Sequence, residues 1–242
     1  MNNKGINRQE NKYFLTFYQY SKIKNDLAKV MKRDENCINN SSYNIRSLYF
    51  DNIFYKCVDE KLSGERHRSK YRVRVYNKDF NNIKLEVKIK NNSLSFKKTY
   101  KIDDKLLQKI VNNYDFSLDK IIDKDLKKEL IYLKHSHYNP KSIINYDRDA
   151  FKIFNNFLRI TFDSNLTREL SNVNFFDLKA QKQKIFIDDL VIMEVKFKNY
   201  IPTFITDIFS KYNINRSAIS KYVLANKYRD FSNDRDLITE TF

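Results

Sequence analysis

The sequence predicts an α+β fold, namely a closed antiparallel eight-stranded β-barrel with flanking helices and a C-terminal helix. The main observation is that Arg, Lys and Glu alternate with apolar residues in separate segments, most clearly at residues 70–76, 85–90, 158–163 and 193–197. Side chains on a strand point alternately to opposite faces, so each segment aims its charges one way and its aliphatic side chains the other. Segments with apolar residues at helical spacing lie between these strands, and no linker rich in Pro, Gly or Ser divides the chain.

The first half of the chain is predicted to hold strands interrupted by two helices. Residues 8–17 form a first strand, and Ser21 is the expected N-cap of the helix that follows. A strand over 43–50 leads into a short helix that opens at Asp51 and ends at Gly64. Three strands with Asn and Asp turns come next, over 69–76, 83–90 and 93–102.

The second half begins with a helical region over 103–137 that Pro140 ends. Further strands are expected over 142–151, 157–163, 184–188 and 190–197, and the last helices over 202–211 and 217–228. In terms of domains, we expect a disordered N-terminus (1–7), one domain (8–230) and a polar tail (231–242).

The shared phase of the charges on about eight strands favours closure of the sheet. A closed barrel has no sheet edges and turns one face of every strand into a lumen. A charged lumen would be costly if it stayed empty, but water, a metal ion or a polyanion would offset that cost. The alternative is an open sheet with helices on its apolar face and the same charges in solvent.

The charge balance indicates a polyanionic partner. The 242 residues include 46 Lys plus Arg and 30 Asp plus Glu, which gives a formal charge of +16. Nucleic acid, an anionic membrane surface, nucleotide and polyphosphate all fit this charge, and charge alone does not choose among them. The content of 41% hydrophobic and 15% aromatic residues is ample for a packed core.

Rare residue types exclude several kinds of site. Cys37 and Cys57 have no CxxC spacing, so neither a disulfide framework nor a structural zinc site is expected, and a cytoplasmic location fits. Gly5 and Gly64 are the only glycines, so side chains must bind any phosphate, because a Gly-rich loop cannot form. No apolar run is long enough to span a bilayer. The three histidines lack ligand spacing and are expected to be surface or structural residues: His67, His135 and His137.

The order of several short segments carries a family resemblance. These segments are residues 8–13, 46–51, 60–76, 85–88, 146–151, 158–163, 193–197 and 220–222. Together they resemble the VTC domain, the catalytic module of the vacuolar transporter chaperone complex, which belongs to the triphosphate tunnel metalloenzyme group. The resemblance implies an eight-stranded tunnel that transfers the terminal phosphate of ATP onto inorganic polyphosphate, with Mn²⁺ or Mg²⁺ as cofactor.

The resemblance also implies roles for individual residues. The catalytic cations that grip phosphate oxygens would be Lys12, Arg72, Arg74, Lys88, Arg148 and Arg159. Further substrate contacts would come from Lys61, Lys97, Lys98, Tyr146, Ser220 and Lys221. Glu194 would bind the metal ion. The register leaves open whether Lys97 or Lys98 takes part, and Glu10 and Glu86 either bind metal or balance neighbouring cations.

Elementary chemistry is consistent with these roles. Phosphoryl transfer depends mainly on positioning and charge neutralisation, which suits a site of Arg, Lys and one metal ion without a protein nucleophile. The planar fork of Arg holds two phosphate oxygens at once, whereas Lys acts as a point charge. A hard divalent ion keeps waters and substrate phosphates as ligands, so one carboxylate can suffice.

Two other functions remain open from the sequence. A tunnel triphosphatase that hydrolyses tripolyphosphate or nucleoside triphosphates would use the same cations. A non-catalytic module that binds polyphosphate or RNA would use them as well, and strand aromatics such as Tyr49 and Tyr71 could then stack on bases, although such residues more often belong to the core. We expect ATP and polyphosphate as partners, no specific nucleic acid and a monomer, and the sequence leaves a membrane partner protein open.

Overall fold

The computed structural model describes residues 9–37, 41–92, 94–112, 121–153, 157–170 and 174–227. The chain forms two compact units, each assembled from three segments. The first unit comprises Met1–Ile45, Asn145–Thr167 and Lys184–Ser220, and the second comprises Arg46–Ile144, Arg168–Gln183 and Lys221–Phe242. The predicted disordered start (1–7) and polar tail (231–242) lie outside the described residues, and the single domain over 8–230 stays a prediction.

The strands form a large antiparallel sheet. They are β1 Gln9–Leu15, β2 Lys32–Arg33, β3 Tyr43–Asp51, β4 His67–Tyr76, β5 Ile83–Asn91, β6 Leu94–Ile102, β7 Asn139–Ile153, β8 Leu158–Glu169, β9 Lys182–Lys184 and β10 Val191–Phe197. Their hydrogen-bonded order is β1-β10-β8-β7-β3-β4-β5-β6, with β2 beside β7 and β9 beside β8. The α+β class with an antiparallel sheet is therefore confirmed. The predicted closed barrel is not, because pairing among the described residues runs from β1 to β6 without closing.

Six helices are present in the described part of the chain: α1 Phe17–Val30, α2 Lys56–Leu62, α3 Asp104–Val111, α4 Lys124–His135, α5 Thr203–Ser210 and α6 Lys221–Lys227. The prediction of Ser21 as N-cap of the first helix was wrong, because Thr16 caps α1. The Thr16 hydroxyl accepts from the Gln19 N–H at 3.2 Å, and the Gln19 side chain accepts from the Thr16 N–H at 2.9 Å. This capping box satisfies helix N–H groups that would otherwise lack partners.

α1 thus begins earlier than predicted, whereas two other helices begin later. α2 begins at Lys56 rather than at Asp51, and the Asp51 carboxylate instead accepts the backbone N–H of Cys57 at 3.0 Å. α6 begins at Lys221 rather than at residue 217, because the Ser217 N–H donates to the Lys12 carbonyl of β1 at 2.8 Å. Gly64 follows the end of α2 with a φ of 73°, as predicted, in a left-handed conformation that glycine adopts readily.

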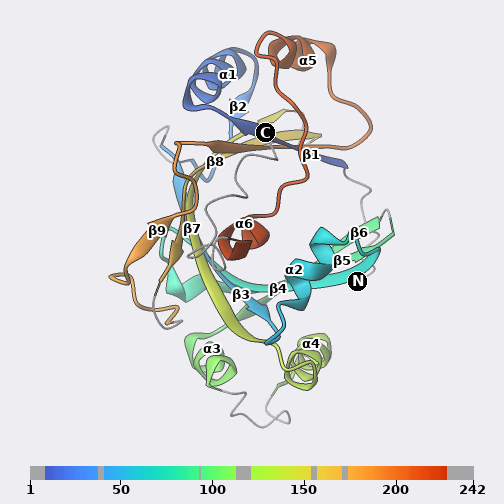
Figure 1. The fold of residues 1–242 in the computed structure, drawn as a ribbon, viewed down its shortest axis with the longest axis vertical. Coiled ribbons are helices and arrows are strands. Elements are labelled where there is room, and N and C mark those ends of the chain that lie inside the picture. The colour runs from blue at the N-terminus through green and yellow to red at the C-terminus, as the bar shows by residue number, and fades with distance from the viewer. Residues whose placement is uncertain are drawn as a thin grey trace. The chain divides into compact units, whose positions relative to one another are not determined.

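The first unit buries its core between strands and two helices. α1 and α5 lie side by side over β1, β10 and β8 (Figure 1). Tyr13 of β1 lies 5.9 Å from Phe209 of α5, and Tyr20 of α1 lies 5.2 Å from Phe162 of β8, both between ring centroids. Fully buried residues of this core include Leu15, Ile23, Leu27, Ile160, Met193 and Val195. Ile23 and Leu27 belong to α1. The other residues are the apolar half of the alternation in their strands, so their charged neighbours face the opposite side of the sheet.

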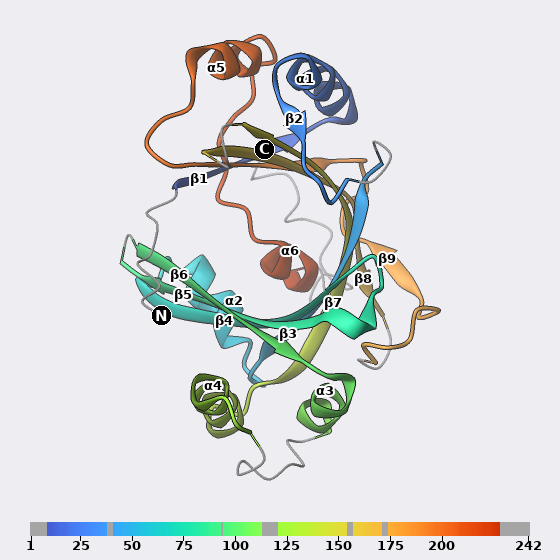
Figure 2. The ribbon, with the colours of Figure 1, turned by 180° about the vertical axis from the view of Figure 1, so that it is seen from behind.

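The second unit has helices on both faces of its strands. α3 and α4 lie on one face of β4, β5 and β6, and α2 and α6 lie on the other (Figures 1 and 2). Tyr71 of β4 stacks on Tyr132 of α4 at 5.6 Å. Tyr222 of α6 stacks on Tyr49 of β3 at 5.1 Å, and the Lys70 ammonium lies 5.4 Å from the Tyr222 ring. Residues in phase with Lys70 therefore face away from α4.

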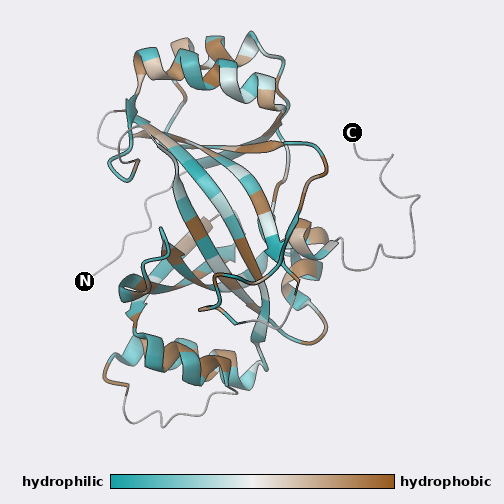
Figure 3. Cartoon of the chain, turned by 90° about the vertical axis from the view of Figure 1, so that its left-hand side faces the viewer, coloured by the Kyte–Doolittle hydropathy of each residue, from teal (hydrophilic) through white to brown (hydrophobic). Residues whose placement is uncertain are grey.

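Polar and apolar residues are mixed around the helices, as expected for helices with one buried face (Figure 3). Among the described residues, no helix is both long and apolar enough to cross a membrane. Cys37 and Cys57 are both buried, with free thiols in this structure.

Candidate functional site

The first unit gathers charges around Glu194 of β10. In the antiparallel pairing of β1 with β10, Lys12 lies opposite Glu194 and Glu10 lies opposite Lys196. The Glu194 carboxylate is 3.2 Å from the Lys12 Nζ, 3.3 Å from the Lys196 Nζ and 3.7 Å from an Arg148 Nη2. Only 5% of Glu194 is exposed, so this carboxylate is both buried and surrounded by cations. We call these five residues the Glu194 cluster: Glu10, Lys12, Arg148, Glu194 and Lys196.

Lys196 is the member that sequence analysis missed. Its Nζ also lies 3.7 Å from Glu10 Oε1, so it bridges the two carboxylates of the cluster. Burial lowers the pKa of Lys196, against the opposing effect of Glu194 and Glu10. The sequence spacing could have indicated it, because Lys196 follows Glu194 by two residues and therefore shares its face of the strand.

Two arginines on this face are each held by a carboxylate. Arg148 is buried, and Arg159 is half-buried. Asp163 accepts from Arg148 Nε at 2.6 Å and from Nη2 at 2.7 Å, in the bidentate geometry that a guanidinium favours. Burial alone would lower the pKa of Arg148, but Asp163 raises it, so the guanidinium stays positively charged. Arg159 donates from Nε to Asp34 at 2.9 Å and from Nη2 to the Tyr43 hydroxyl at 3.1 Å.

Tyr146 of β7 is almost fully buried, and its ring centroid lies 5.5 Å from the Arg148 guanidinium carbon. Arg159 lies opposite Lys196 in the β10–β8 register, directly beside the Glu194 cluster. The structure thus brings together Lys12, Arg148, Arg159, Tyr146 and Glu194 from the predicted set.

The second unit gathers charges around Glu86 of β5. The Glu86 carboxylate accepts from Arg72 Nε at 2.7 Å, lies 3.6 Å from Arg74 Nη1 and pairs with Lys97. Burial raises the pKa of this carboxyl, but Arg72, Arg74 and Lys97 together hold it well below its usual range. We call these four residues the Glu86 cluster: Arg72, Arg74, Glu86 and Lys97. Glu86 therefore balances neighbouring cations, which is the reading that the structure favours over metal binding.

Strand register decides between Lys97 and Lys98. Lys97 lies opposite Lys88, which lies opposite Lys70, so these three lysines share the face of the Glu86 cluster. Lys98 lies opposite Val87 on the other face, and its Nζ lies 2.7 Å from Glu129 of α4. The predicted residues Arg72, Arg74, Lys88 and Lys97 thus come together, whereas Lys98 holds a helix in place.

Two hydroxyl groups support the arginines from β3. Arg72 Nη1 donates to the Tyr49 hydroxyl at 3.2 Å, and Arg74 Nε donates to the Ser47 hydroxyl at 3.1 Å. Burial raises the pKa of Tyr49, but Arg72, Arg74 and Lys70 outweigh it and lower the pKa to about 8. The sequence indicated Tyr49 as a core aromatic residue or a residue that stacks on bases, and not as a partner of Arg72.

The other predicted substrate contacts are placed as follows. Lys61 is half-buried in the last turn of α2, which packs against β4 and α6. Ser220 is half-buried at the end of the first unit, and Lys221 is a buried residue at the start of α6. The chain just before them runs beside β1, where the Lys12 Nζ donates to the Ile219 carbonyl at 3.2 Å. Their roles toward substrate stay predictions.

The metal prediction can be tested against the donor groups present. The described residues contain no group of three His, Cys, Asp or Glu side chains that could hold a metal ion. A protein-only cage is therefore absent from this part of the chain. Mg²⁺ and similar ions are often bound by one or two carboxylates with waters and substrate phosphates, and Glu194 with Glu10 fits that pattern. Thr161, which lies opposite Glu194, has a buried hydroxyl without a hydrogen-bond partner, as expected beside a position for water or a ligand oxygen.

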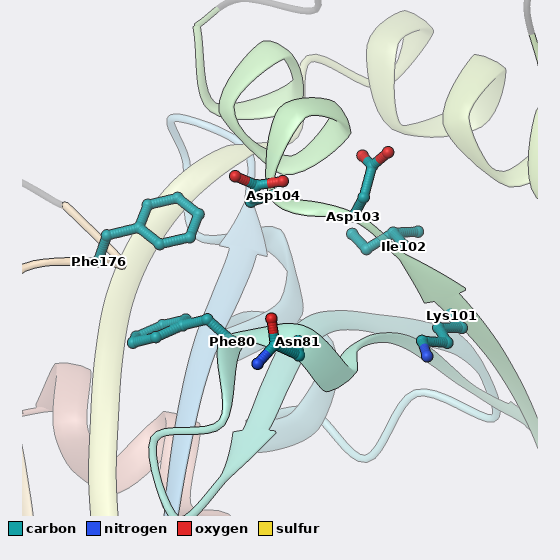
Figure 4. Close-up of a pocket in the computed structure, with 7 residues that line it drawn as sticks. All are labelled: Phe80, Asn81, Lys101, Ile102, Asp103, Asp104 and Phe176. Carbon is teal, nitrogen blue, oxygen red and sulfur yellow. The ribbon is translucent and has the colours of Figure 1, made fainter.

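A surface pocket of about 620 Å³ in the second unit lies elsewhere (Figure 4). It is lined by Phe80, Asn81, Lys101, Ile102, Asp103, Asp104 and Phe176, none of which is a predicted site residue. The Asp103 carboxylate is already occupied as the N-cap of α3, where it accepts the Leu106 N–H at 2.7 Å. Lys101 is the one cation among these lining residues and lies with two aspartates, so the pocket lacks the group of cations that a polyanion would need.

Fold and site together define an α+β protein whose antiparallel strands carry two groups of cations, each arranged around a buried glutamate. The sequence matches the model of the VTC domain over residues 7–228, and the chain belongs to this family. No curated protein matched the sequence.

Among solved structures, the chain is similar to the PH1819 protein of Pyrococcus horikoshii, with 11% identity and a TM-score of 0.47 over 92% of this chain and 99% of that chain. It is also similar to a "putative adenylate cyclase" of Bacillus halodurans, with 11% identity and a TM-score of 0.49 over 93% and 98%. A third similarity is to the Schizosaccharomyces pombe Mediator head module, with 6% identity and a TM-score of 0.46 over 84% and 90%.

Proposed function

We propose that this protein is a polyphosphate polymerase, which transfers the terminal phosphate of ATP onto a growing inorganic polyphosphate chain with Mn²⁺ or Mg²⁺. The observation that carries the proposal is the pair of cation groups on single strand faces, in a chain that belongs to the VTC domain family. The tunnel that the family resemblance implies is part of the proposal.

Binding would proceed by exchange of carboxylate partners for phosphate oxygens. In the second unit, Lys88 and Lys97 are exposed and the Arg72 side chain is 26% exposed, so these cations can reach a ligand without unfolding the strand. Arg72 and Arg74 offer planar guanidinium groups that match phosphate geometry. Glu86 keeps them oriented while no phosphate is bound.

In the first unit, Glu194 is the group that would hold the divalent ion, with Glu10 beside it. The ion would neutralise charge that develops on the transferring phosphoryl group. Lys12 and Lys196 would then turn from Glu194 toward phosphate oxygens. Arg148 would keep its orientation because both its Nε and Nη2 are already fixed by Asp163. This division of labour fits phosphoryl transfer, which needs positioned charges more than covalent catalysis.

The product of ATP turnover tests the proposal. Purified full-length protein is incubated with Mn²⁺ and ATP that carries a label on its terminal phosphate, and the products are separated by gel electrophoresis. We expect the label in a long polymer that an exopolyphosphatase degrades. Label that appears only as free phosphate would replace the proposal with the triphosphatase. Unchanged ATP, together with tight binding of added polyphosphate, would replace it with a binding module.

A further inference from the structure

The arginine pair of the Glu86 cluster lies between two tyrosines. On one side, the Tyr49 hydroxyl accepts a hydrogen bond from Arg72 at 3.2 Å. On the other side, Tyr76 forms a side-chain hydrogen bond with Arg74, whose guanidinium carbon lies 5.9 Å from the Tyr76 ring centroid. Tyr49 is 3% exposed, so its phenol meets Arg72 inside the protein rather than in solvent.

The charges around Tyr49 are mostly positive. From β4, Arg72, Arg74 and Lys70 all act on its phenol. From α6, Tyr222 stacks on it at 5.1 Å, and the Tyr222 hydroxyl in turn donates to Asp51 at 2.9 Å. From β5, Glu86 acts through Arg72, which it binds. A negative charge on the Tyr49 oxygen is therefore stabilised by the same cations that are proposed to bind phosphate.

We propose that Tyr49 is a positioning residue that holds Arg72 in the empty protein, and that binding of a phosphate chain to Arg72 and Arg74 is coupled to protonation of the Tyr49 phenol. This inference rests on the proposed function, because it takes these arginines as phosphate ligands. A phosphate and an ionised phenol are both stabilised by the same guanidinium groups. A bound phosphate neutralises these groups and repels the phenolate, so the Tyr49 phenolate takes up a proton from solvent.

The sign of the resulting pH dependence follows from linkage. With a pKa of about 8 in the empty protein, Tyr49 is protonated near neutral pH and ionised at more alkaline pH. In the alkaline range, binding consumes a proton, so phosphate affinity falls by up to about tenfold for each unit of pH. Near neutral pH, Tyr49 already carries its proton and contributes no such dependence.

The first experiment compares Tyr49→Phe with the parent protein. Affinity for inorganic tripolyphosphate is measured by calorimetry near neutral pH and again about two units higher, in buffers of different ionisation enthalpy. The titration of tripolyphosphate itself is common to both proteins and cancels in the comparison. We expect the loss of affinity with pH to be steeper in the parent, by roughly tenfold over this range, with measurable proton uptake that Tyr49→Phe lacks. Equal slopes and equal proton uptake would overturn the inference.

Two matched variants separate Tyr49 from its neighbours. Tyr222→Phe removes the stacked phenol, whose pKa burial and Asp51 raise, so it stays protonated in this range and the parental slope should persist. Tyr76→Phe removes the phenol on the Arg74 side. The fall of tripolyphosphate affinity with pH that this variant still shows is assigned to Tyr49. Loss of the slope in Tyr222→Phe together with its persistence in Tyr49→Phe would overturn the assignment.

A second measurement needs no variant. The chain contains no Trp, so the near-ultraviolet absorbance of ionised tyrosine is not obscured. At moderately alkaline pH, tripolyphosphate should lower this absorbance in the parent by about one tyrosine, and an unchanged absorbance under saturating ligand would contradict the inference. Failure here is distinct from failure of the proposed function. If phosphate binding is coupled to protonation of Tyr49 but no polymer forms from ATP, only the polymerase proposal is refuted. If polymer forms without this proton uptake, only this inference is refuted.

Discussion

Glu86 and Glu194 are both buried among cations, but Glu194 has further oxygen groups beside it. Each buried carboxylate contacts three cations within 4 Å. Glu194 also has a second carboxylate nearby, since Glu10 shares both Lys12 and Lys196 with it, and Thr161, with its buried hydroxyl, lies opposite Glu194 on the neighbouring strand β8. These neighbours are oxygen ligands of the kind a hard divalent ion prefers. These differences are the basis for the proposal that Glu194 binds the metal ion, whereas Glu86 is paired with Arg72, Arg74 and Lys97.

At the residue scale, Glu86→Gln should destabilise the empty protein. The substitution keeps the shape of the side chain but leaves Arg72, Arg74 and Lys97 without their shared anion. The expected loss is about 1–3 kcal/mol, because two of the three cations are partly exposed to solvent. Tripolyphosphate should restore more stability to Glu86→Gln than to the parent, since it returns negative charge to the cluster.

Chemical denaturation with and without tripolyphosphate measures both effects. Glu35→Gln is the matched control, because Glu35 pairs with Lys152 but its side chain is 88% exposed, and its substitution should change stability by less than about 0.5 kcal/mol. Equal stability of Glu86→Gln and the parent would argue against a balancing role.

At the element scale, strand phase was the most predictable property of this chain. Alternation of charged and apolar residues correctly placed Arg72 and Arg74 on one face of β4, with Tyr71 and Val73 on the other. Register between strands could not be predicted, because it depends on turn geometry and on partners distant in sequence. For that reason the choice between Lys97 and Lys98, and the pairing of Glu86 with its cations, required the structure.

The β6 strand offers a matched pair of substitutions. Lys97→Ala removes a cation from the Glu86 cluster and should weaken polyphosphate binding several-fold, with little change in fold. Lys98→Ala removes one of two partners of Glu129, which also accepts from the Tyr71 hydroxyl, so it should cost about 1 kcal/mol of stability, because Lys98 is 46% exposed. Lys98→Ala should leave polyphosphate affinity unchanged. A larger loss of affinity in Lys98→Ala than in Lys97→Ala would mean that the face of β6 is misassigned.

Helix starts were less predictable than strands. Thr16 and Ser21 are both suitable N-cap residues, and only the Gln19 side chain in its reciprocal bond distinguishes them. Thr16→Ala should lower the free energy of unfolding by about 1 kcal/mol, whereas Ser21→Ala, inside α1, should leave it nearly unchanged or raise it slightly. Equilibrium denaturation of both variants measures this, and the reverse order of effects would show that α1 begins near Ser21.

At the scale of the whole molecule, the charge of +16 attracts any polyanion, so charge does not identify the ligand. The two clusters do more than provide charge, because their cations are held in fixed geometry by buried carboxylates. Polyphosphate should therefore protect the protein against thermal unfolding in moderate salt. RNA should protect it only at low salt, because contacts to a basic surface alone are screened and compete with counterions. Sequence-selective RNA binding that survives moderate salt would contradict this account.

The most direct test concerns Glu194, on which the distinction between catalysis and binding depends. The initial rate of polyphosphate formation from ATP is measured as a function of Mn²⁺ concentration in the parent and in Glu194→Gln, beside the polyphosphate affinity of each protein. Because the substitution removes the charge that is proposed to bind the metal ion and retains the cations, we predict near-parental polyphosphate affinity and a rate at least about a hundredfold lower. A near-normal rate with the parental Mn²⁺ dependence would contradict the account.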